Sequence, residues 1–358
     1  MMTPRERVLT AMRRQQPDRV PRRLEYSSFV ASTMAVFRQK TGAVDPEEYF
    51  AYEIRNLSFR PTQRREGLAR YLPKVIPENT MIDWEWGNLL QKGHHDNISQ
   101  VVHYALANAE TAEDIAAYPM PDLLAPYRWQ HVAPGVQQLH ARDLAVMGFM
   151  SQTLFEAAWG VRGFENLLMD FYINPELVEA LLDRLTEIRV RQAVLFAQAG
   201  VDVLRLGDDV GTERGMLISP AIFREWLKPR LARIIRAARE VRPDILVFFH
   251  SDGDCREVIE DLIEIGVDIL NPVQPECMDP AEIKALYGDR LAFWGTVGTQ
   301  TTMPFGTPEE VRQVVRERIE TVGAGGGLLL APTHMLQAEV PWENILAFFS
   351  AVDEFGTY

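Results

Sequence analysis

The sequence predicts an α/β protein: one (β/α)8 TIM barrel formed by residues 1–358, with an irregular N-terminal insertion. Short apolar runs alternate with amphipathic helical patterns from residue 143 onward, as expected for a parallel sheet. Six such βα units follow residue 143, and each apolar run ends in polar residues. A doubly wound open sheet is the alternative, but no glycine fingerprint supports it, because Gly325–Gly327 precedes a strand instead of following one.

Composition and charge indicate a globular protein that does not bind nucleic acid. The 358 residues are 47% hydrophobic and 24% charged, and the formal net charge of −13 opposes phosphate binding. The N-terminal stretch lacks the apolar core of a signal peptide, and no apolar run reaches 18 residues. We therefore expect a cytoplasmic protein that does not enter the membrane; a homodimer stays open.

The first two strands are expected near residues 22–26 and 54–59, and they complete a barrel of eight. A first helix precedes them: Thr3 can cap it, Pro4 occupies its first position, and Glu6 completes a capping box.

Residues 60–135 form the least regular part of the chain, and we expect an excursion over the barrel mouth. An antiparallel strand is predicted at 101–107, after a turn at residues 96–97. His94 and His95 are adjacent, so on an extended chain they point to opposite faces and seldom bind one ion.

From residue 143 the strands and helices can be assigned in order from hydrophobic periodicity and capping signals. Strands are predicted at 144–150, 201–206, 245–249, 267–270, 291–294 and 328–330. Helices are predicted at 155–170, 175–199, 220–241, 279–286, 307–319 and 342–355, with a further one after residue 255.

Polar residues end every clear strand, and in a barrel these ends converge on one rim where active sites are built. They are Ser151, Gln152, Asp208, Asp209, His250, Asp252, Asn271, Gln274, Thr296, Thr333 and His334. Two imidazoles and one carboxylate, from His250, His334 and Asp252, would leave an open coordination position, as in a catalytic zinc site. The alternative is that each histidine only hydrogen-bonds a loop carbonyl.

Other candidates surround this predicted metal site. Asp208 or Asp209 could orient a ligand histidine or handle a substrate proton, whereas helix capping by Asp209 is the alternative. Glu25 could act at the end of the first strand, but a surface carboxylate is the favoured interpretation. Arg205, inside a buried strand, needs a carboxylate partner. Cys255 and Cys277 could be soft metal ligands, and the first turn of a helix would stabilise the Cys255 thiolate, but ordinary small residues are the favoured interpretation for both.

Six motifs, in order, resemble the uroporphyrinogen decarboxylase-like superfamily, and within it the cobamide-dependent methyltransferase branch. They are TPRERVLTAMRRQQPDRVP near the N-terminus, GDDVG, HSDGD, NPVQP, FWGTVGTQ and PWENI. The resemblance covers essentially the whole chain. It implies a (β/α)8 barrel with the ligand site at its C-terminal mouth.

The resemblance also implies a reaction. Zinc methyltransferases of this superfamily carry His-x-Cys after one strand and a Cys after the last. Here His250 matches the histidine, while Asp252 and His334 stand at the two cysteine positions. His and Asp ligands leave zinc more electrophilic, which suits an ether oxygen. We therefore expect zinc-dependent methyl transfer between a small methylated, methoxy-type donor or acceptor and a partner protein that carries a corrinoid.

Two alternatives remain from the sequence. The decarboxylases of the superfamily, which are carboxy-lyases, place Arg-Gln-Ala-Gly-Arg just after the first strand, but Arg22–Phe29 reads RRLEYSSF. The similar GLARYLP at Gly67–Pro73 comes some forty residues too late. The second alternative is a tetrapyrrole or corrinoid binder without catalytic activity.

Overall fold

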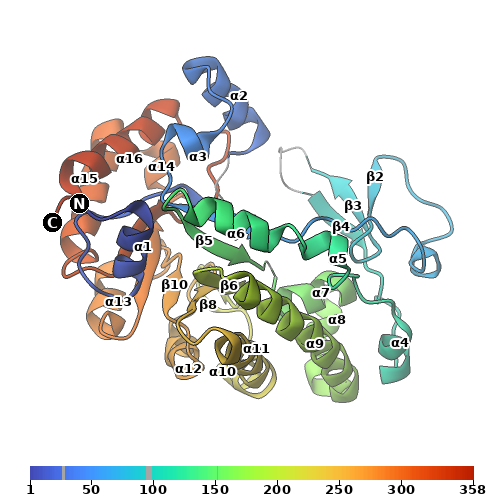
Figure 1. The fold of residues 1–358 in the computed structure, drawn as a ribbon. Helices are drawn as coiled ribbons and strands as arrows, with labels where there is room; N and C mark the ends of the chain where they lie inside the picture. Colours follow the sequence, from blue (N-terminus) through green and yellow to red (C-terminus); the bar gives the residue numbers. More distant parts are fainter. Residues whose placement is uncertain (26–28, 94–98, 151) are drawn as a thin grey trace.

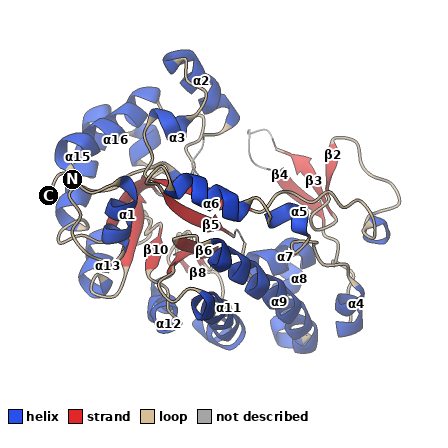
Figure 2. Ribbon diagram, in the orientation of Figure 1, coloured by secondary structure: helices blue, strands red, loops and turns tan. Residues whose placement is uncertain are grey.

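A curled parallel sheet surrounded by helices forms the body of the protein (Figures 1 and 2). The computed structural model describes residues 1–25, 29–93, 99–150 and 152–358. Within them, seven strands pair in parallel in the order β1-β5-β6-β9-β10-β11-β12. These strands are β1 (Ile54–Ser58), β5 (Ala145–Phe149), β6 (Val203–Gly207), β9 (Leu246–His250), β10 (Ile269–Asn271), β11 (Ala292–Val297) and β12 (Leu328–Pro332). The predicted (β/α)8 barrel is confirmed.

The eighth position of the barrel is held by residues 21–24, between β12 and β1. Arg22 forms a parallel bridge with Leu330, whose N–H donates to the Pro21 carbonyl at 2.9 Å. On the other side, the Arg23 guanidinium donates to Asn56 Oδ1 of β1 at 3.1 Å.

The strand expected at 22–26 is therefore one bridge long, and that prediction was wrong in extent. Pro21 has no N–H to give to a ladder, and the Arg23 guanidinium occupies the Leu24 carbonyl. Residue 26 lies outside the described part of the chain.

The N-terminal helix α1 (Pro4–Met12) closes the bottom of the barrel. Thr3 and Glu6 form the predicted capping box. On the inner face, Val8, Ala11 and Met12 are fully buried against the side chains that fill the barrel interior. This lower interior layer includes Ile54, Ala145, Met147, Val203, Leu246, Phe248, Ile269, Ala292, Trp294, Leu329 and Ala331.

A ring of helices covers the outside of the sheet, and both chain termini lie on the same side of it (Figure 1). The principal helices are α6 (Val132–His140), α7 (Phe155–Arg162), α8 (Phe164–Ile173), α9 (Pro175–Ala199), α11 (Lys228–Val241), α12 (Ile259–Glu264), α13 (Pro280–Tyr287), α15 (Pro308–Thr321) and α16 (Trp342–Phe355). Shorter ones are α2 (Ala31–Thr41), α3 (Pro46–Tyr49), α4 (Ala112–Ala117), α5 (Pro126–Trp129), α10 (Pro220–Ile222) and α14 (Thr302–Phe305). Within the described part of the chain, no helix is both long enough and apolar enough to cross a lipid bilayer.

The N-terminal insertion contains a small antiparallel sheet beside the barrel (Figure 2). Its described strands are β2 (Thr80–Asp83), β3 (Asn88–Lys92) and β4 (Ser99–His103). The insertion is tied to the barrel helices because Asn88 Nδ2 donates to the Gly160 carbonyl at 2.9 Å, and Arg162 donates to the Leu106 carbonyl at 2.7 Å. His94, His95 and the turn expected at 96–97 lie outside the described residues.

Candidate metal centre at the barrel mouth

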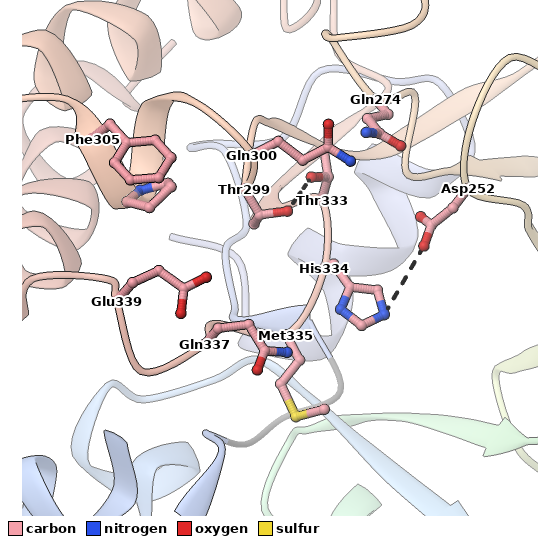
Figure 3. A pocket seen from close by; sticks show the side chains of 11 residues that line it. Asp252, Gln274, Thr299, Gln300, Phe305, Thr333, His334, Met335, Gln337 and Glu339 are labelled. Carbon is pink, nitrogen blue, oxygen red and sulfur yellow. Dashed lines mark hydrogen bonds and ion pairs between the residues drawn. The ribbon is translucent and has the colours of Figure 1, made fainter. Parts of the chain in front are cut away.

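The carboxyl ends of three strands bring two histidines and two aspartates together at the barrel mouth. His250 ends β9, Asp252 follows it, Asp209 follows β6, and His334 follows β12. His250 Nε2 lies 3.7 Å from Asp209 Oδ1 and 3.9 Å from Asp252 Oδ2. His334 Nε2 lies 4.0 Å from Asp252 Oδ2 (Figure 3). Asp209, His250 and Asp252 thus face one another at the expected rim, and His334 lies beside Asp252.

These separations fit a small divalent cation. Two ligand atoms at about 2.0–2.1 Å from zinc, in tetrahedral geometry, lie about 3.3 Å apart. The ligand atoms of Asp209, His250 and Asp252 all lie within 4.8 Å of one another, which is wider than this spacing but still groups them around one point. The sequence named Asp252 and His250 as ligands; the geometry adds Asp209 beside them and places His334 within reach of Asp252.

Asn271, the last residue of β10, fixes which nitrogen of His250 faces the cluster. Its amide nitrogen donates to the Trp294 carbonyl at 2.7 Å, so its Oδ1 is turned toward His250. His250 Nδ1 lies 2.5 Å from that oxygen and must carry the hydrogen. The Nε2 atom is left facing the carboxylates, which is how a metal-binding histidine is oriented by its neighbours.

Two loops cross closely to position Asp252. Its backbone N–H donates to Asp209 Oδ1 at 2.8 Å, and the next N–H, of Gly253, donates to Gln274 Oε1 at 3.1 Å. Gly253 has a φ of 76°, and a Cβ there would lie 2.7 Å from the Gly211 backbone. Burial raises the pKa of Asp252 to about 6, although His250 acts in the opposite direction.

Asp208 and Asp209 point to different places. Asp208 is fully buried, and its carboxylate accepts the backbone N–H groups of Leu154 and Glu156 at 2.9 and 3.0 Å. It thereby caps α7, while burial raises its pKa to about 7. The capping role that the sequence suggested for Asp209 belongs to Asp208, and Asp209 is the one that reaches the cluster.

Glu25 is not the surface carboxylate that the sequence favoured. It is 1% exposed and accepts a hydrogen bond from Arg205 Nη1 at 2.6 Å, so Arg205 has the carboxylate partner it was expected to need. The Arg205 guanidinium also lies over the rings of Phe149 and Phe248. Burial by itself would raise the pKa of Glu25, but Arg205 and Arg23 outweigh it and the pKa is lowered.

Glu156, in the first turn of α7, is a site residue that sequence reasoning missed. Its Oε2 accepts the Asp209 N–H at 3.3 Å. Burial, with the charges of Asp209 and Asp208, raises its pKa to about 9. An acid in the first turn after a strand end was the available signal, but such acids usually only complement the helix dipole.

Two cavities adjoin the cluster within the described part of the chain. One of about 360 Å³ is bordered by Glu156, Arg205, Asp209, His250 and His334, among others. A second, of about 440 Å³, is bordered by Asp252 and His334, which Figure 3 shows together with other residues that line it. His334 borders both the first, inner cavity and the second, outer one.

The cysteines lie away from this chemistry. Cys255 is fully buried, and burial raises its thiol pKa to about 12, which opposes the alternative of a stabilised thiolate and agrees with the favoured interpretation of an ordinary small residue. Its position at the entry to a short helical turn does not offset the loss of water. Burial also raises the pKa of Cys277, to about 11.

Comparison with known proteins gives a consistent family. The model of the family described as uroporphyrinogen decarboxylase (URO-D) matches residues 102–355. A methylcobamide:CoM methyltransferase of Methanosarcina barkeri is 29% identical over 51% of this chain and 50% of its own length. A uroporphyrinogen decarboxylase of Gloeobacter violaceus is 26% identical over 58% of each. The chain spans about half the length of the curated methyltransferases it matches.

Among solved structures, a methyltransferase from Methanosarcina mazei shares the fold. Its TM-score is 0.71, and the match covers 99% of both chains at 20% sequence identity. At 20% sequence identity, this similarity is evidence for a shared fold only.

Proposed function

The chain belongs to the uroporphyrinogen decarboxylase (URO-D) family, and on that basis we propose that it is a zinc-dependent methyltransferase. It moves a methyl group between a small methoxy substrate and the corrinoid of a separate protein. The observation that carries this proposal is the group of nitrogen and carboxylate donors at the barrel mouth. The ligand atoms of Asp209, His250 and Asp252 there lie within 4.8 Å of one another. A similar methyltransferase among the relatives supports the choice of reaction.

The residues have distinct roles in this proposal. His250, Asp252 and His334 hold the ion, and Asp209 orients the Asp252 loop through its backbone N–H. A zinc ion held there would supply Lewis-acid polarisation of the ether oxygen. The neutral nitrogens of the two histidines and the Asp252 carboxylate would leave the ion more electrophilic than thiolates would.

The methyl transfer needs no reagent beyond the methoxy substrate, the corrinoid of the partner protein and water. In the demethylation direction, the corrinoid of the partner protein would supply the nucleophile that takes the methyl group. The carbon–oxygen bond breaks, its electron pair stays on the substrate oxygen, and that oxygen takes a proton from water. The cavities beside His334 hold the substrate so that its methyl group faces the open mouth.

We propose further that the whole chain, 1–358, is one barrel domain and that residues 60–135 partly cover its mouth. A cavity of about 230 Å³ supports this placement, because Glu85 and Trp86 of the insertion border it together with Gln152 of the mouth. The corrinoid protein would dock over the part of the mouth that the insertion leaves open.

Metal analysis tests the site. We expect protein purified without added zinc to contain one equivalent of zinc, and His250→Ala, Asp252→Ala and His334→Ala to lose it. His131→Ala is the matched control, because that ring contacts the Ser58 carbonyl at 3.0 Å and lies outside the cluster. Absence of stoichiometric metal, together with wild-type zinc affinity in His334→Ala, would refute the assignment.

Methyl transfer itself is followed by absorbance, as cob(I)alamin becomes methylcobalamin in the presence of a methoxy compound. We expect turnover that requires zinc and is lost in His250→Ala. Consumption of uroporphyrinogen without methyl transfer would instead support the decarboxylase alternative. Corrinoid or porphyrin binding without any turnover would support a protein that only binds such a ligand.

A further inference from the structure

The outer cavity is a built pocket whose wall includes two proposed metal ligands. Asp252 and His334 form one side of its 440 Å³, and Glu339 stands on the opposite side, with its carboxylate turned toward the interior (Figure 3). At about 30 Å³ for each water-sized group, this volume suits a molecule of roughly fifteen non-hydrogen atoms. A substrate seated here lies against the cluster.

The charges around this cavity are of one sign. Among the described residues that line it, Asp252 and Glu339 are acidic, and lysine and arginine are absent. The nearest guanidinium in the inner cavity is that of Arg205, and the buried Glu25 carboxylate offsets its charge at 2.6 Å. An anionic group in the outer cavity would therefore find no cation on the described walls.

A bound divalent ion does not reverse this balance. Asp209 and Asp252 carry two negative charges, which offset the two positive charges of the ion. Glu339 then leaves the outer cavity with a net negative wall. A carboxylate or sulfonate placed between Glu339 and the cluster is disfavoured by like-charge repulsion.

The remaining walls offer neutral hydrogen-bonding groups. Gln274 is 6% exposed, and its Oε1 accepts the Gly253 N–H, which leaves its amide NH₂ as the donor end beside the cavity. The hydroxyl groups of Thr299 and Thr333 lie 3.0 Å apart on the same wall. Gln337 adds a further amide. Such a mixture of donors and acceptors suits hydroxyl and ether oxygens.

From this arrangement we infer that the substrate of the proposed methyl transfer is an uncharged methoxy compound bearing hydroxyl groups. Carboxylated and sulfonated methyl donors or acceptors are selected against, and so is a tetrapyrrole with acidic side chains. Glu339 is the residue that sets this selection. The inference rests on the proposed function in that it treats the bound compound as the substrate of methyl transfer. The selection between neutral and anionic compounds is a property of the cavity itself.

Binding of matched probes to the zinc-loaded protein tests the inference without any methyl transfer. Methyl β-D-glucopyranoside and methyl β-D-glucuronide differ by one carboxylate, as do 4-methoxybenzyl alcohol and 4-methoxybenzoate. In at least one pair we expect the neutral member to bind about tenfold or more tightly than the anion, measured by ligand-observed NMR. Equal or tighter binding of the anions, or no binding of any probe, overturns the inference.

A charge reversal tests the role of Glu339. Glu339→Lys is expected to raise the affinity for the anionic member of the pair relative to the neutral one by tenfold or more. Glu66→Lys makes the same change in net charge at an exposed position outside both cavities, and it should leave the ratio unchanged. An unchanged ratio in Glu339→Lys overturns the role of Glu339. Loss of methyl transfer with the selectivity intact would instead count against the proposed function alone.

Discussion

Single side chains decide the chemistry at the barrel mouth, and Asn271 is the clearest case. Its amide is oriented by the Trp294 carbonyl, and it in turn sets the tautomer of His250. Neither contact can be inferred from the sequence, since NPVQP shows only that a polar residue ends a strand. The side chain that presents Nε2 of His250 to the cluster is therefore invisible until the neighbouring strands are placed side by side.

Replacing Asn271 should weaken metal binding without removing a ligand. We expect Asn271→Leu to lower zinc affinity by about 10–100-fold, because the acceptor that holds His250 Nδ1–H is lost. Competition with a chromophoric chelator measures the affinity. Asn271→Asp keeps an acceptor at the same place and should retain the affinity. Wild-type affinity in the leucine variant would contradict the role given to this amide.

Glu25 is better explained by charge pairing than by catalysis. Its carboxylate meets Arg205 inside the barrel, and both side chains are almost completely buried. We expect Glu25→Ala to lower the free energy of unfolding by about 3–5 kcal/mol, because it leaves a buried guanidinium without its carboxylate. Urea denaturation measures the change. The double variant Glu25→Leu, Arg205→Met should recover much of the loss.

A fall of less than about 1 kcal/mol in Glu25→Ala, the range of an exposed ion pair, would show that Arg205 does not depend on Glu25. Loss of methyl transfer in a variant of normal stability would return Glu25 to the catalytic residues that the sequence proposed.

At the scale of elements, glycine positions the loop that carries Asp252. The β9–α12 loop at Gly253 crosses the loop after β6 at Gly211 so closely that a Cβ on either would meet the other backbone within 2.8 Å. The GDDVG and HSDGD motifs thus contain glycines for a shared reason, which is the contact between them. Their closeness follows from the neighbouring register of β6 and β9, where Gly207 pairs with His250.

Gly253→Ala should therefore disturb the metal site more than the fold. An added Cβ would meet the Gly211 backbone, and the φ of 76° at Gly253 also disfavours any residue with a side chain. We therefore expect the free energy of unfolding to fall by about 1–2 kcal/mol and zinc binding to weaken. Gly160→Ala is the control: it lies in α7, where an added methyl group would have nothing within 4 Å, and it should be neutral or stabilising. Equal effects of the two substitutions on zinc affinity would contradict this.

Two helices predicted from hydrophobic periodicity are divided in the structure. The helix predicted at 155–170 is divided by Gly163, whose φ of 93° ends α7. The helix predicted at 220–241 contains a π-helical turn, Phe223–Leu227, just before α11. Pro229 at the start of α11 explains the turn, because proline cannot donate to the carbonyl four residues earlier. Periodicity indicated the extent of these helices, while backbone geometry divided them.

Across the whole molecule, the sequence was most informative where elements repeat. The six βα units after residue 143 were predicted because buried parallel strands are short apolar runs between amphipathic helices. The rim location of His250, Asp252 and His334 followed from that order. The insertion at 60–135 and the bridge at residues 21–24 could not be predicted in the same way, because contacts between residues distant in sequence hold them. Asp209 and Glu156 joined the site for the same reason.

One buried carboxylate links the bottom of the barrel to its wall. Asp202, which precedes β6, accepts hydrogen bonds from Arg5 Nη2 at 2.7 Å, His140 Nε2 at 2.9 Å and the Val146 N–H at 3.0 Å. It thus joins α1, α6 and β5 at the end of the barrel opposite the metal centre. Burial would raise the pKa of Asp202, but these hydrogen bonds and Arg5 outweigh it and the pKa is lowered.

This lowered pKa fixes the direction of a pH effect on stability. The ionised Asp202 stabilises the fold fully above its ordinary pKa of 3.8, and that contribution is lost as the pH falls through the lower folded-state value. We expect Asp202→Asn to lower the free energy of unfolding by about 3–5 kcal/mol at pH 7. Below pH 3.8 the difference should shrink, because the wild-type carboxylate becomes protonated too. Urea denaturation at pH 7, 5 and 3 measures it. A difference that grows toward acid pH would mean that Asp202 is protonated in the native protein, and the link between α1 and the barrel wall would then not depend on its charge.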